Sequence, residues 1–358
     1  MGPPNLRVAA VSVAGEDRPF WSVMIPTYEP RREYLSEMLE SVLQQDPGRD
    51  QMQIEVVDDC SPHVDVVSMV HRLAGDRVRV FTNDSNLGLA RCWNRCIERS
   101  AGRWVHLLHQ DDRLHSRFYK SMESLISTHP EAMVAFCQHE FIDSSGKVTG
   151  VPPPLQEAAG CLRGGVKTLA VKNKMQCPAV LVRRDAYEQA GGFDPQLKYV
   201  VDWEMWMRLA SRFQVVYTTD VLASHRVHSE SESSRLSDTG ETVYDMARVI
   251  GTLNRYVSQE DLAEVQQLAR TWMANMAIHK SRSFIESRQP EQAMQQLRAL
   301  LAVDKTARSW RRAVQLWLSA MLKSKRFVMP PLVASTRMAR PGKGRRTTFR
   351  APPTTPRP

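Results

Sequence analysis

The chain has 358 residues and a formal net charge of +9 at pH 7, and this length is sufficient for one large α/β domain or two smaller domains. No segment approaches the roughly eighteen consecutive apolar residues of a transmembrane helix, and residues 1–19 lack the apolar core of a signal peptide, so we expect a cytoplasmic protein. The six cysteines form no CxxC pair and no zinc-type cluster with histidine, which predicts reduced, structural thiols.

Short apolar runs alternate with helical patterns through the first 112 residues. The strand-like segments are 21–28, 53–62, 77–84 and 103–112, and the helical segments between them are 32–45, 64–74 and 88–102. This alternation predicts a doubly wound, mostly parallel α/β sheet. In such sheets, ligands bind beyond the carboxyl ends of the strands.

Acidic side chains follow two of these strands. Asp58 and Asp59 end the second strand, and Asp111 and Asp112 end the fourth. Carboxylates repel phosphate unless a divalent cation such as Mg²⁺ or Mn²⁺ lies between them. No G-x-G-x-x-G follows the first strand and no P-loop motif occurs, which argues against a Rossmann dehydrogenase and a P-loop NTPase. The alternative is that the acidic pairs only form solvated turns or helix caps.

The C-terminal part of the chain carries the excess of positive charge. From Lys305 to Pro358 there are 14 Lys or Arg and no Asp or Glu, so residues 1–304 carry 34 basic and 39 acidic side chains. Residues 309–328 have apolar side chains at helical spacing between basic ones, whereas residues 329–358 are too rich in Pro, Gly, Thr and Arg to bury a core. We expect an amphipathic helix and a disordered tail, suited to an anionic membrane surface or a nucleic acid.

An ordered series of motifs resembles the family 2 glycosyltransferases, which have the GT-A fold. The series is SVMIPTYE, VVDDCSP, NLGLARCWNRCIERSAGRWVHLLHQDD, GGFDPQLKYVVDWEMWMRLA and HRVHSES, and it covers roughly residues 20–235. The resemblance implies an enzyme that moves a sugar from a nucleotide diphosphate-sugar to an acceptor hydroxyl. The chain lacks the Q-x-x-R-W motif and the transmembrane spans of processive synthases, so the expected reaction adds one sugar at a time.

The resemblance also implies which residues bind the nucleotide-sugar donor. The loop of Pro26, Tyr28 and Glu29 would contact the nucleobase, with Tyr28 stacked on it and Asp59 accepting its imino hydrogen. The pattern N-x-G-x-x-x-x-x-N would supply Asn86 and Asn94, Gly88 at a tight helix entry, and Arg91 to offset phosphate charge. The alternatives are a core aromatic at Tyr28 and a solvated surface arginine at Arg91.

Within the same resemblance, Asp112 would bind the metal, Mg²⁺ or Mn²⁺, and Asp111 the ribose or sugar hydroxyls. Many family members have a further acid where this chain has His109, which either replaces that acid or only packs. Arg226 and His228 would lie near the diphosphate, with His228 binding metal or phosphate. A loop histidine with neither role is the alternative.

The family's general base is an acid that follows a G-G-F-D turn, at 191–194 here. Asp202 is the predicted base, and Glu204 is held in reserve because a two-residue shift would exchange their roles. The acid usually found directly before the base is replaced by Val201. Alternatively, Asp202 only caps the helix that follows it.

The sequence therefore predicts four regions: an N-terminal extension at 1–19, a GT-A domain at 20–235, a helical region at 236–328 and a basic tail at 329–358. The expected reaction is metal-dependent, inverting transfer from a UDP-sugar to a glycan or lipid-linked acceptor in cell-surface glycan or glycolipid synthesis. The rival hypotheses are a nucleotidyltransferase and a non-catalytic protein that binds nucleic acid through the tail. We expect the C-terminal segment to contact a membrane, with Trp310 and Trp317 at the headgroups; a helix packed on the enzyme is the alternative.

Overall fold

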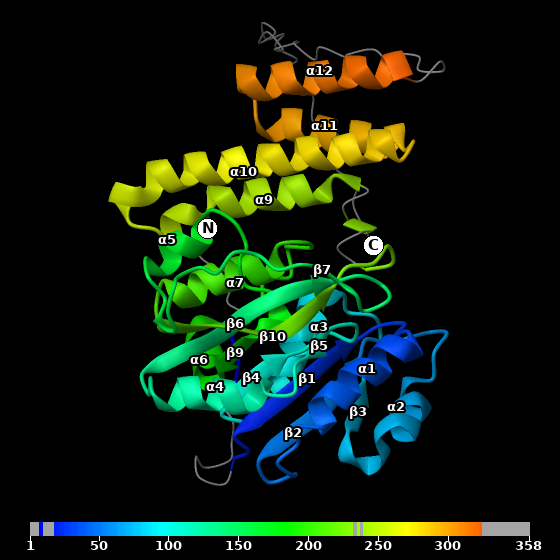
Figure 1. Ribbon diagram of the computed structural model, residues 1–358, viewed down its shortest axis with the longest axis vertical. Coiled ribbons are helices and arrows are strands. Elements are labelled where there is room, and N and C mark those ends of the chain that lie inside the picture. Colours follow the sequence, from blue (N-terminus) through cyan, green and yellow to red (C-terminus); the bar gives the residue numbers. More distant parts are fainter. Residues whose placement is uncertain (1–6, 10–17, 232–234, 237–238, 324–358) are drawn as a thin grey trace, which may run out of the picture.

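The computed structural model describes residues 7–9, 18–231, 235–236 and 239–323. The predicted basic tail and most of the N-terminal extension lie outside these residues. The described chain forms a sheet domain, with a stack of helices on one side of it (Figure 1).

The first half of the sheet domain has the predicted alternation of strands and helices. Its elements are β1 (Trp21–Thr27), α1 (Arg32–Leu43), β2 (Met52–Asp58), α2 (Val66–Ala74), β3 (Arg79–Thr82), α3 (Leu89–Arg99) and β4 (Trp104–Leu107). The strands lie in the order β3-β2-β1-β4, and all three pairings are parallel. The expectation of a mostly parallel α/β sheet is therefore confirmed for this half.

The second half of the domain extends the same sheet with mixed pairings. Its elements are β5 (Arg113–Leu114), α4 (Phe118–Ser127), β6 (Ala132–Ile142), β7 (Val148–Gly150), β8 (Gly160–Cys161), α5 (Gly165–Ala170), β9 (Val180–Arg183), α6 (Arg184–Ala190), α7 (Val201–Ala210) and β10 (Gln214–Arg226). The order continues β4-β9-β6-β10-β5, with β9 antiparallel to both neighbours and β6 parallel to β10.

Two apolar cores cover the two faces of this sheet. Along β1, Val23 and Ile25 point into the core shared with α1, α2 and α4, whereas Met24 points into the core shared with α3 and α7. This alternation is the period of two that a strand imposes. Pro26 remains within β1 because β4 pairs only with Trp21–Met24, so the missing N–H faces no partner strand there.

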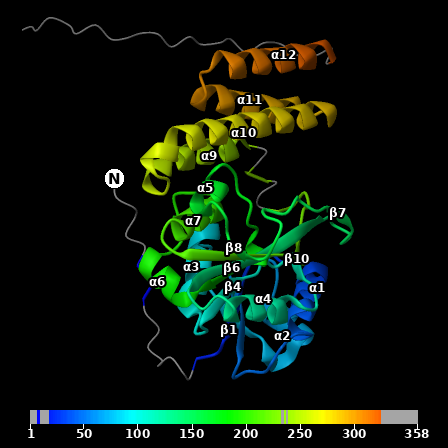
Figure 2. The same cartoon turned by 60° about the vertical axis from the view of Figure 1, so that its left-hand side comes forward.

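In the part that the structure describes, the region predicted to be helical at residues 236–328 consists of helices joined by short connections. It contains α9 (Glu241–Gly251), α10 (Gln259–Glu286), α11 (Pro290–Val303) and α12 (Ala307–Lys323). Figures 1 and 2 show these helices stacked beyond α5 and α7. Their apolar side chains continue the core on the α3 and α7 face of the sheet, so the stack and the sheet domain share one core.

Polar contacts reinforce this junction. Lys167 of α5 lies 2.6 Å from Asp261 and 3.0 Å from Glu264, both on α10. The buried Asp245 of α9 accepts hydrogen bonds from the backbone N–H groups of Lys198 and Tyr199, at 2.6 and 2.7 Å. The loop that leads into α7 is therefore attached to the helix stack.

The last described helix, α12, packs on α10 and α11. Ala313 is buried and Trp317 packs partly buried against the core, whereas Trp310 and Leu318 remain 52% and 48% exposed. The helix is thus packed on the enzyme, as in the alternative interpretation of the sequence, but it keeps an apolar and basic outer face. Among the described helices, none is both long enough and apolar enough to cross a bilayer.

A buried histidine in β4 gives the fold a defined acid sensitivity. His106 is fully buried, stacks on Phe118 with 4.8 Å between ring centroids, and lies 3.0 Å from both the Tyr119 hydroxyl and the Pro178 carbonyl oxygen. Burial lowers its pKa from the ordinary 6.5 to about 3. The folded protein therefore keeps this ring neutral at a pH where the unfolded chain binds a proton.

We predict that this difference destabilises the protein as the pH falls from 6.5 toward 3. The contribution is about 1.4 kcal/mol per pH unit within that window and vanishes above it, because the ring is then neutral in both states. Urea unfolding at several pH values measures the slope. His106→Gln should make it shallower by about that amount, whereas the exposed His71→Gln should not. Parallel slopes for the wild type and His106→Gln would contradict the assignment.

Candidate active site

The acidic pair predicted at the end of the fourth strand lies in a turn. β4 ends at Leu107, and Asp111 and Asp112 lie between it and β5. β5 pairs antiparallel with β10, with Arg113 opposite Ser224. That register brings His225 and the residues after it alongside the acidic turn, so two motifs more than a hundred residues apart form one site.

Asp112 is the most buried group of this site, with no exposed side-chain surface. Its Oδ1 accepts a hydrogen bond of 2.9 Å from the backbone N–H of Arg226 and lies 3.1 Å from Nδ1 of His225. Its Oδ2 has no hydrogen-bond partner among the described residues, although Nδ1 of His109 lies 3.5 Å away. Buried carboxylate oxygens are normally paired, so Oδ2 is available to a ligand.

The residues around Asp112 fit a divalent cation. His109, Asp111 and Asp112 each offer one donor atom, and these atoms lie within 4.8 Å of one another. Nε2 of His109 is also buried without a hydrogen-bond partner in the described part of the chain. A cation would satisfy both the unpaired carboxylate oxygen and an imidazole nitrogen, and both are common ligands of Mn²⁺.

The neighbouring acid, Asp111, is paired with a histidine. Nε2 of His228 lies 2.8 Å from its Oδ2. Burial alone would raise the pKa of Asp111, but the hydrogen bond from His228 and the charges of His109 and His225 outweigh it and lower the pKa. The structure thus brings together the predicted sugar-binding acid and the predicted metal-binding histidine, and it keeps the acid ionised.

Arg226 supports the acidic turn from inside the protein. Its guanidinium is fully buried, donates to the Asp111 carbonyl oxygen at 2.8 Å and to Glu37 of α1 at 2.6 Å, and lies over the ring of Tyr34. It also donates to the carbonyl oxygen of Asp143 at 3.2 Å. Each of its three nitrogen atoms is bonded inside the protein and the side chain has no exposed surface, so the structure gives Arg226 a structural role in place of the expected contact with the sugar donor.

The loop expected to hold the nucleobase lies against the same turn. The backbone N–H of Tyr28 donates to the side chain of Gln110 at 2.9 Å, and that side chain donates back to the Tyr28 carbonyl at 3.1 Å. The Tyr28 ring is 40% exposed, so it is not the core aromatic of the alternative. Glu29 has a φ of 47°, and its backbone and side chain are bonded to Ser61 and His63. Pro26 precedes this loop at the end of β1.

Asp59 joins this loop region to the start of α3. Its carboxylate accepts hydrogen bonds of 2.9 Å from the Asn83 side chain and from the backbone N–H groups of Leu87 and Gly88. Asn86 also accepts from Gly88, at 3.0 Å. Gly88 has a φ of 78°, which favours glycine directly before the helix. Arg91 is exposed one turn into α3, so the structure brings the predicted Asn86, Gly88 and Arg91 to the same helix end.

The predicted base, Asp202, lies in the first turn of α7. Val200 occupies the cap position of this helix, so the alternative in which Asp202 is the N-cap is wrong. Its carboxylate accepts hydrogen bonds of 2.7 Å from the Asn173 side chain and from the backbone N–H of Trp203. Burial raises its pKa, against these hydrogen bonds and the charges of His109 and His225. Asp202 therefore lies near the histidines that flank Asp112.

The structure argues against Glu204 as the reserve base. Its carboxylate is buried and forms a bidentate ion pair with Arg208, at 3.1 and 2.8 Å, and it accepts a hydrogen bond from Tyr256. Arg208 also donates to the backbone carbonyls of residues 190–192. A carboxylate held in this way has no free access to a substrate, so we assign Glu204 to the packing of α7.

Sequence reasoning missed three neighbours of the site. His225 is the first residue of the HRVHSES motif, but its contact with Asp112 follows from the register of β5 and β10. Gln110 lies inside the HQDD segment, but its contact with Tyr28 is visible only in the folded structure. Asn173 belongs to no motif of the sequence, and only the structure shows its bond to Asp202.

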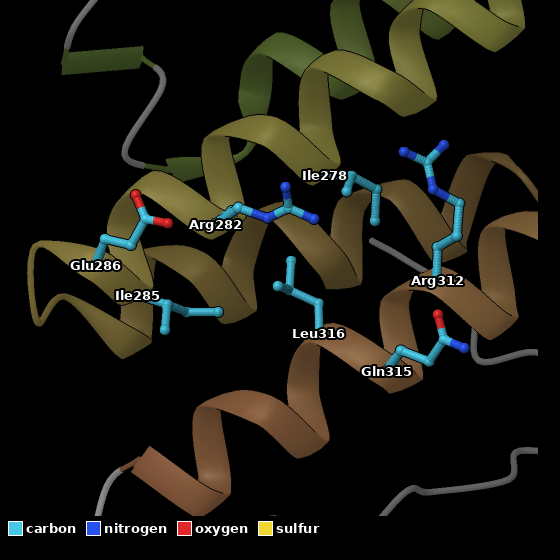
Figure 3. Close-up of a pocket in the computed structure, with 7 residues that line it drawn as sticks. All are labelled: Ile278, Arg282, Ile285, Glu286, Arg312, Gln315 and Leu316. Carbon is cyan, nitrogen blue, oxygen red and sulfur yellow. The ribbon is translucent and has the colours of Figure 1, made fainter.

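A separate groove of about 320 Å³ lies between α10 and α12 (Figure 3). Ile278, Ile285 and Leu316 form its apolar part, and Arg282 and Arg312 lie at its sides. None of the predicted donor, metal or catalytic residues lines it. The candidate active site is therefore the acidic turn with its surrounding loops.

Comparison with known proteins identifies the domain. The family model described as glycosyl transferase family 2 matches residues 22–191, which include the loops after β1 and β2 and the acidic turn. Residues 22–191 therefore form a family 2 glycosyltransferase domain. The match ends before Asp202 and His228, so the predicted base and the HRVHSES motif lie outside the matched residues. The recognised family and the enzyme class expected from the motifs are both confirmed.

Three known proteins are similar to this chain in sequence or in structure. TuaG of Bacillus subtilis, named as a teichuronic acid biosynthesis glycosyltransferase, is 25% identical over 243 residues, which are 66% of this chain and 90% of TuaG. The structure of residues 1–349 of S. aureus TarS in complex with UDP-GlcNAc aligns with a TM-score of 0.61 at 17% identity, over 85% of this chain and 90% of that one. The mannosyltransferase PcManGT from Pyrobaculum calidifontis, in complex with GDP-Man and Mn²⁺, aligns at 0.54 and 16% identity, over 88% and 85%. The structural likeness confirms the GT-A fold.

The G-G-F-D turn of this glycosyltransferase packs tightly against α3. The Asn94 side chain accepts from the N–H of Phe193 at 2.7 Å and donates to its carbonyl oxygen at 2.9 Å. A Cβ atom on Gly192 would lie 2.4 Å from Oδ1 of Asn94. Glycine is therefore required at 192 by the close approach of a neighbouring side chain.

We predict that Gly192→Ala lowers the free energy of unfolding by roughly 1–3 kcal/mol, because the new methyl group displaces Asn94 from Phe193. Gly251→Ala is the matched control, since a Cβ there meets no heavy atom within 4 Å. Chemical denaturation of both variants measures the difference. Equal stabilities for the two variants would show that the turn relaxes without cost.

Proposed function

We propose that this glycosyltransferase moves one sugar, with inversion and with the help of a divalent cation, from a UDP-sugar to an acceptor hydroxyl. The observation that carries the proposal is the fully buried Asp112 with its unpaired Oδ2, placed beside Asp111 and the surrounding histidines. A buried carboxylate oxygen without a hydrogen-bond partner is costly. A divalent cation held by these residues would remove that cost and would supply positive charge toward the donor diphosphate.

Asp112, Asp111 and the nearby imidazoles would hold Mg²⁺ or Mn²⁺, with His228 beside Asp111. The bound cation would supply charge to stabilise the departing nucleoside diphosphate. His228 also holds the Asp111 carboxylate in place, so Asp111 is oriented for the hydroxyls of the ribose or the sugar. PcManGT, whose structure contains Mn²⁺, is similar in fold and supports a metal in this site.

The donor would lie along the loops at the carboxyl ends of β1 and β2. Tyr28, which is exposed and bonded through its backbone to Gln110, would stack on the nucleobase. Asp59 accepts three hydrogen bonds, and a carboxylate has about four acceptor sites, so one remains for an imino N–H. Gly88 and Arg91 at the start of α3 would face the diphosphate, where a helix N-terminus and a cation favour negative charge.

Asp202 would take the proton of the acceptor hydroxyl as its oxygen attacks the anomeric carbon. Its raised pKa, caused by burial, brings the carboxylate closer to the range in which a general base works well. The hydrogen bonds from Asn173 and Trp203 hold the carboxylate in one orientation. This arrangement positions the base before the acceptor arrives.

The biological acceptor would be a cell-surface glycan or a lipid-linked precursor of one. TuaG, a relative by sequence over most of its length, is named for teichuronic acid biosynthesis. The outer face of α12 is consistent with work at a membrane, because Lys305, Arg308 and Arg311 are exposed beside the exposed Trp310 and Leu318. We propose that this face holds the enzyme on the cytoplasmic side of an anionic membrane.

A donor screen tests the activity directly. The full chain is incubated with UDP-sugars and GDP-sugars, candidate glycan acceptors and Mn²⁺ or Mg²⁺, and the released nucleoside diphosphate is measured. Asp112→Asn is the reference for lost activity, and we expect it to retain less than about a tenth of the wild-type rate, a change of at least ~1.4 kcal/mol in the barrier. Release of pyrophosphate in place of the nucleoside diphosphate would indicate a nucleotidyltransferase and overturn the proposal.

We predict that Asp202→Asn lowers kcat by roughly 10²-fold or more, while the affinity for the donor is retained, because the base acts only on the acceptor in the transition state. Glu204→Gln is the comparison variant. It should lower stability, through the loss of the Arg208 ion pair, and leave the rate per folded molecule near that of the wild type. An active Asp202→Asn together with an inactive Glu204→Gln would reverse the two roles.

We predict that the full chain sediments with vesicles containing phosphatidylglycerol at low salt and is released at high salt. The variant Arg308→Glu/Arg311→Glu should stay in the supernatant, because each basic residue near an anionic surface contributes about 1 kcal/mol. The control Arg72→Glu/Lys120→Glu changes the net charge equally on exposed residues of α2 and α4 and should still sediment. If both double variants lose binding equally, only net charge is involved and α12 is not the contact surface.

A further inference from the structure

The position of His109 carries an inference about which metal the site accepts. Its ring stacks on Trp93, with 5.1 Å between centroids and 28° between planes. Trp93 in turn packs edge-on against Phe193, at 5.0 Å, in the turn that Asn94 holds. The imidazole is therefore fixed by packing from α3 and lies beside Asp112 without being bonded to it.

Three buried atoms around Asp112 lack hydrogen-bond partners among the described residues, namely Oδ2 of Asp112, Nε2 of His109 and Nδ1 of His225. Nδ1 of the His109 ring lies 3.5 Å from Oδ2 of Asp112. A carboxylate oxygen needs a positive partner, and an imidazole nitrogen has a lone pair to donate. With Asp111, the donor atoms of these residues lie within the 4.8 Å that one ion can bridge.

The other two histidines of the site have assigned contacts. His228 is bonded to Asp111 at 2.8 Å. Nδ1 of His225 lies 3.1 Å from Oδ1 of Asp112, the oxygen that also accepts the backbone N–H of Arg226, so His225 lies at the other oxygen of this carboxylate. His109 is the histidine whose ring lies next to the unpaired Oδ2 of Asp112 and whose donor atom clusters with those of Asp111 and Asp112.

We propose that His109 is a nitrogen ligand of the catalytic cation and makes this site prefer Mn²⁺ over Mg²⁺. Mg²⁺ is a hard ion that selects oxygen ligands in near-ideal octahedral geometry, whereas Mn²⁺ stands further along the series toward ions that accept imidazole. The inference rests on the proposed metal-dependent function. It concerns this chain in particular, because the imidazole lies where the sequence motif would otherwise have a carboxylate.

Binding of the metal alone tests the proposal without any enzymatic readout. The dissociation constants of Mn²⁺ and Mg²⁺ are measured for the full chain by calorimetry, and pulsed EPR of bound Mn²⁺ detects ¹⁴N coupling from directly bound imidazole. In His109→Asp we expect the ratio of the Mg²⁺ to the Mn²⁺ dissociation constant to fall roughly tenfold and the ¹⁴N coupling to be lost or greatly reduced. The exposed His279→Gln on α10 is the control and should change neither.

A second variant guards against misfolding of His109→Asp, which places another carboxylate beside Asp112. His109→Gln adds no charge and should weaken Mn²⁺ binding roughly tenfold while keeping the circular dichroism of the wild type. Unchanged Mn²⁺ affinity and ¹⁴N coupling in both variants would overturn the role of His109 and leave the metal-dependent function standing. If wild-type protein binds neither ion and transfers sugar in excess EDTA, the metal dependence itself fails, and this inference fails with it.

Discussion

The burial of the Asp112 carboxylate is the constraint on which the rest of the active site depends. A side chain with no exposed surface needs partners inside the protein, and its Oδ1 finds one in the backbone N–H of Arg226. That hydrogen bond exists only because β5 pairs with β10 in the register that sets Arg113 against Ser224. The acidic turn, the edge of the sheet and the histidine-bearing end of β10 are therefore positioned as one unit.

Arg226 connects the buried Asp112 to helix α1, which covers one face of the sheet. Its backbone N–H donates to Asp112, and its guanidinium donates to the carbonyl oxygen of Asp111 and to the carboxylate of Glu37 on α1. The guanidinium also lies over the ring of Tyr34. A buried guanidinium is tolerated because its donors are paired and Glu37 offsets its charge. On the other face, the stacked Trp93 holds His109. The site is thus supported from both sides of the sheet, which keeps its charged groups fixed before any ligand arrives.

Much of this arrangement could be predicted from the sequence, because local patterns determine it. The alternation of apolar runs and helical periods located β1 to β4, although β4 ends at Leu107 and the predicted strand ends at Asp112. The same pattern predicted Asp59, Asp111 and Asp112 beyond β2 and β4, and the structure has them there. What escaped prediction depends on long-range packing. Glu204 and Asp202 are two residues apart, and only the position of Arg208 and Tyr256 shows that Glu204 belongs to the core. The same holds for Arg226, whose motif suggested a phosphate contact but whose donors are used inside the protein.

The stack of helices beyond α7 also sets the distance between α12 and α7. Trp203 of α7, next to Asp202, contacts Trp272 of α10 with 5.9 Å between ring centroids, and α12 packs on the far side of α10 (Figure 2). Packed helices lie roughly 8–10 Å apart, and α10 lies between α12 and α7 (Figure 2), so about two such spacings separate α12 from the helix that carries the proposed base. Any surface that α12 contacts is held away from the reacting atoms by that amount. An acceptor rooted in that surface must extend across the gap, and the helix stack would then act as a spacer that sets a minimum length for the acceptor.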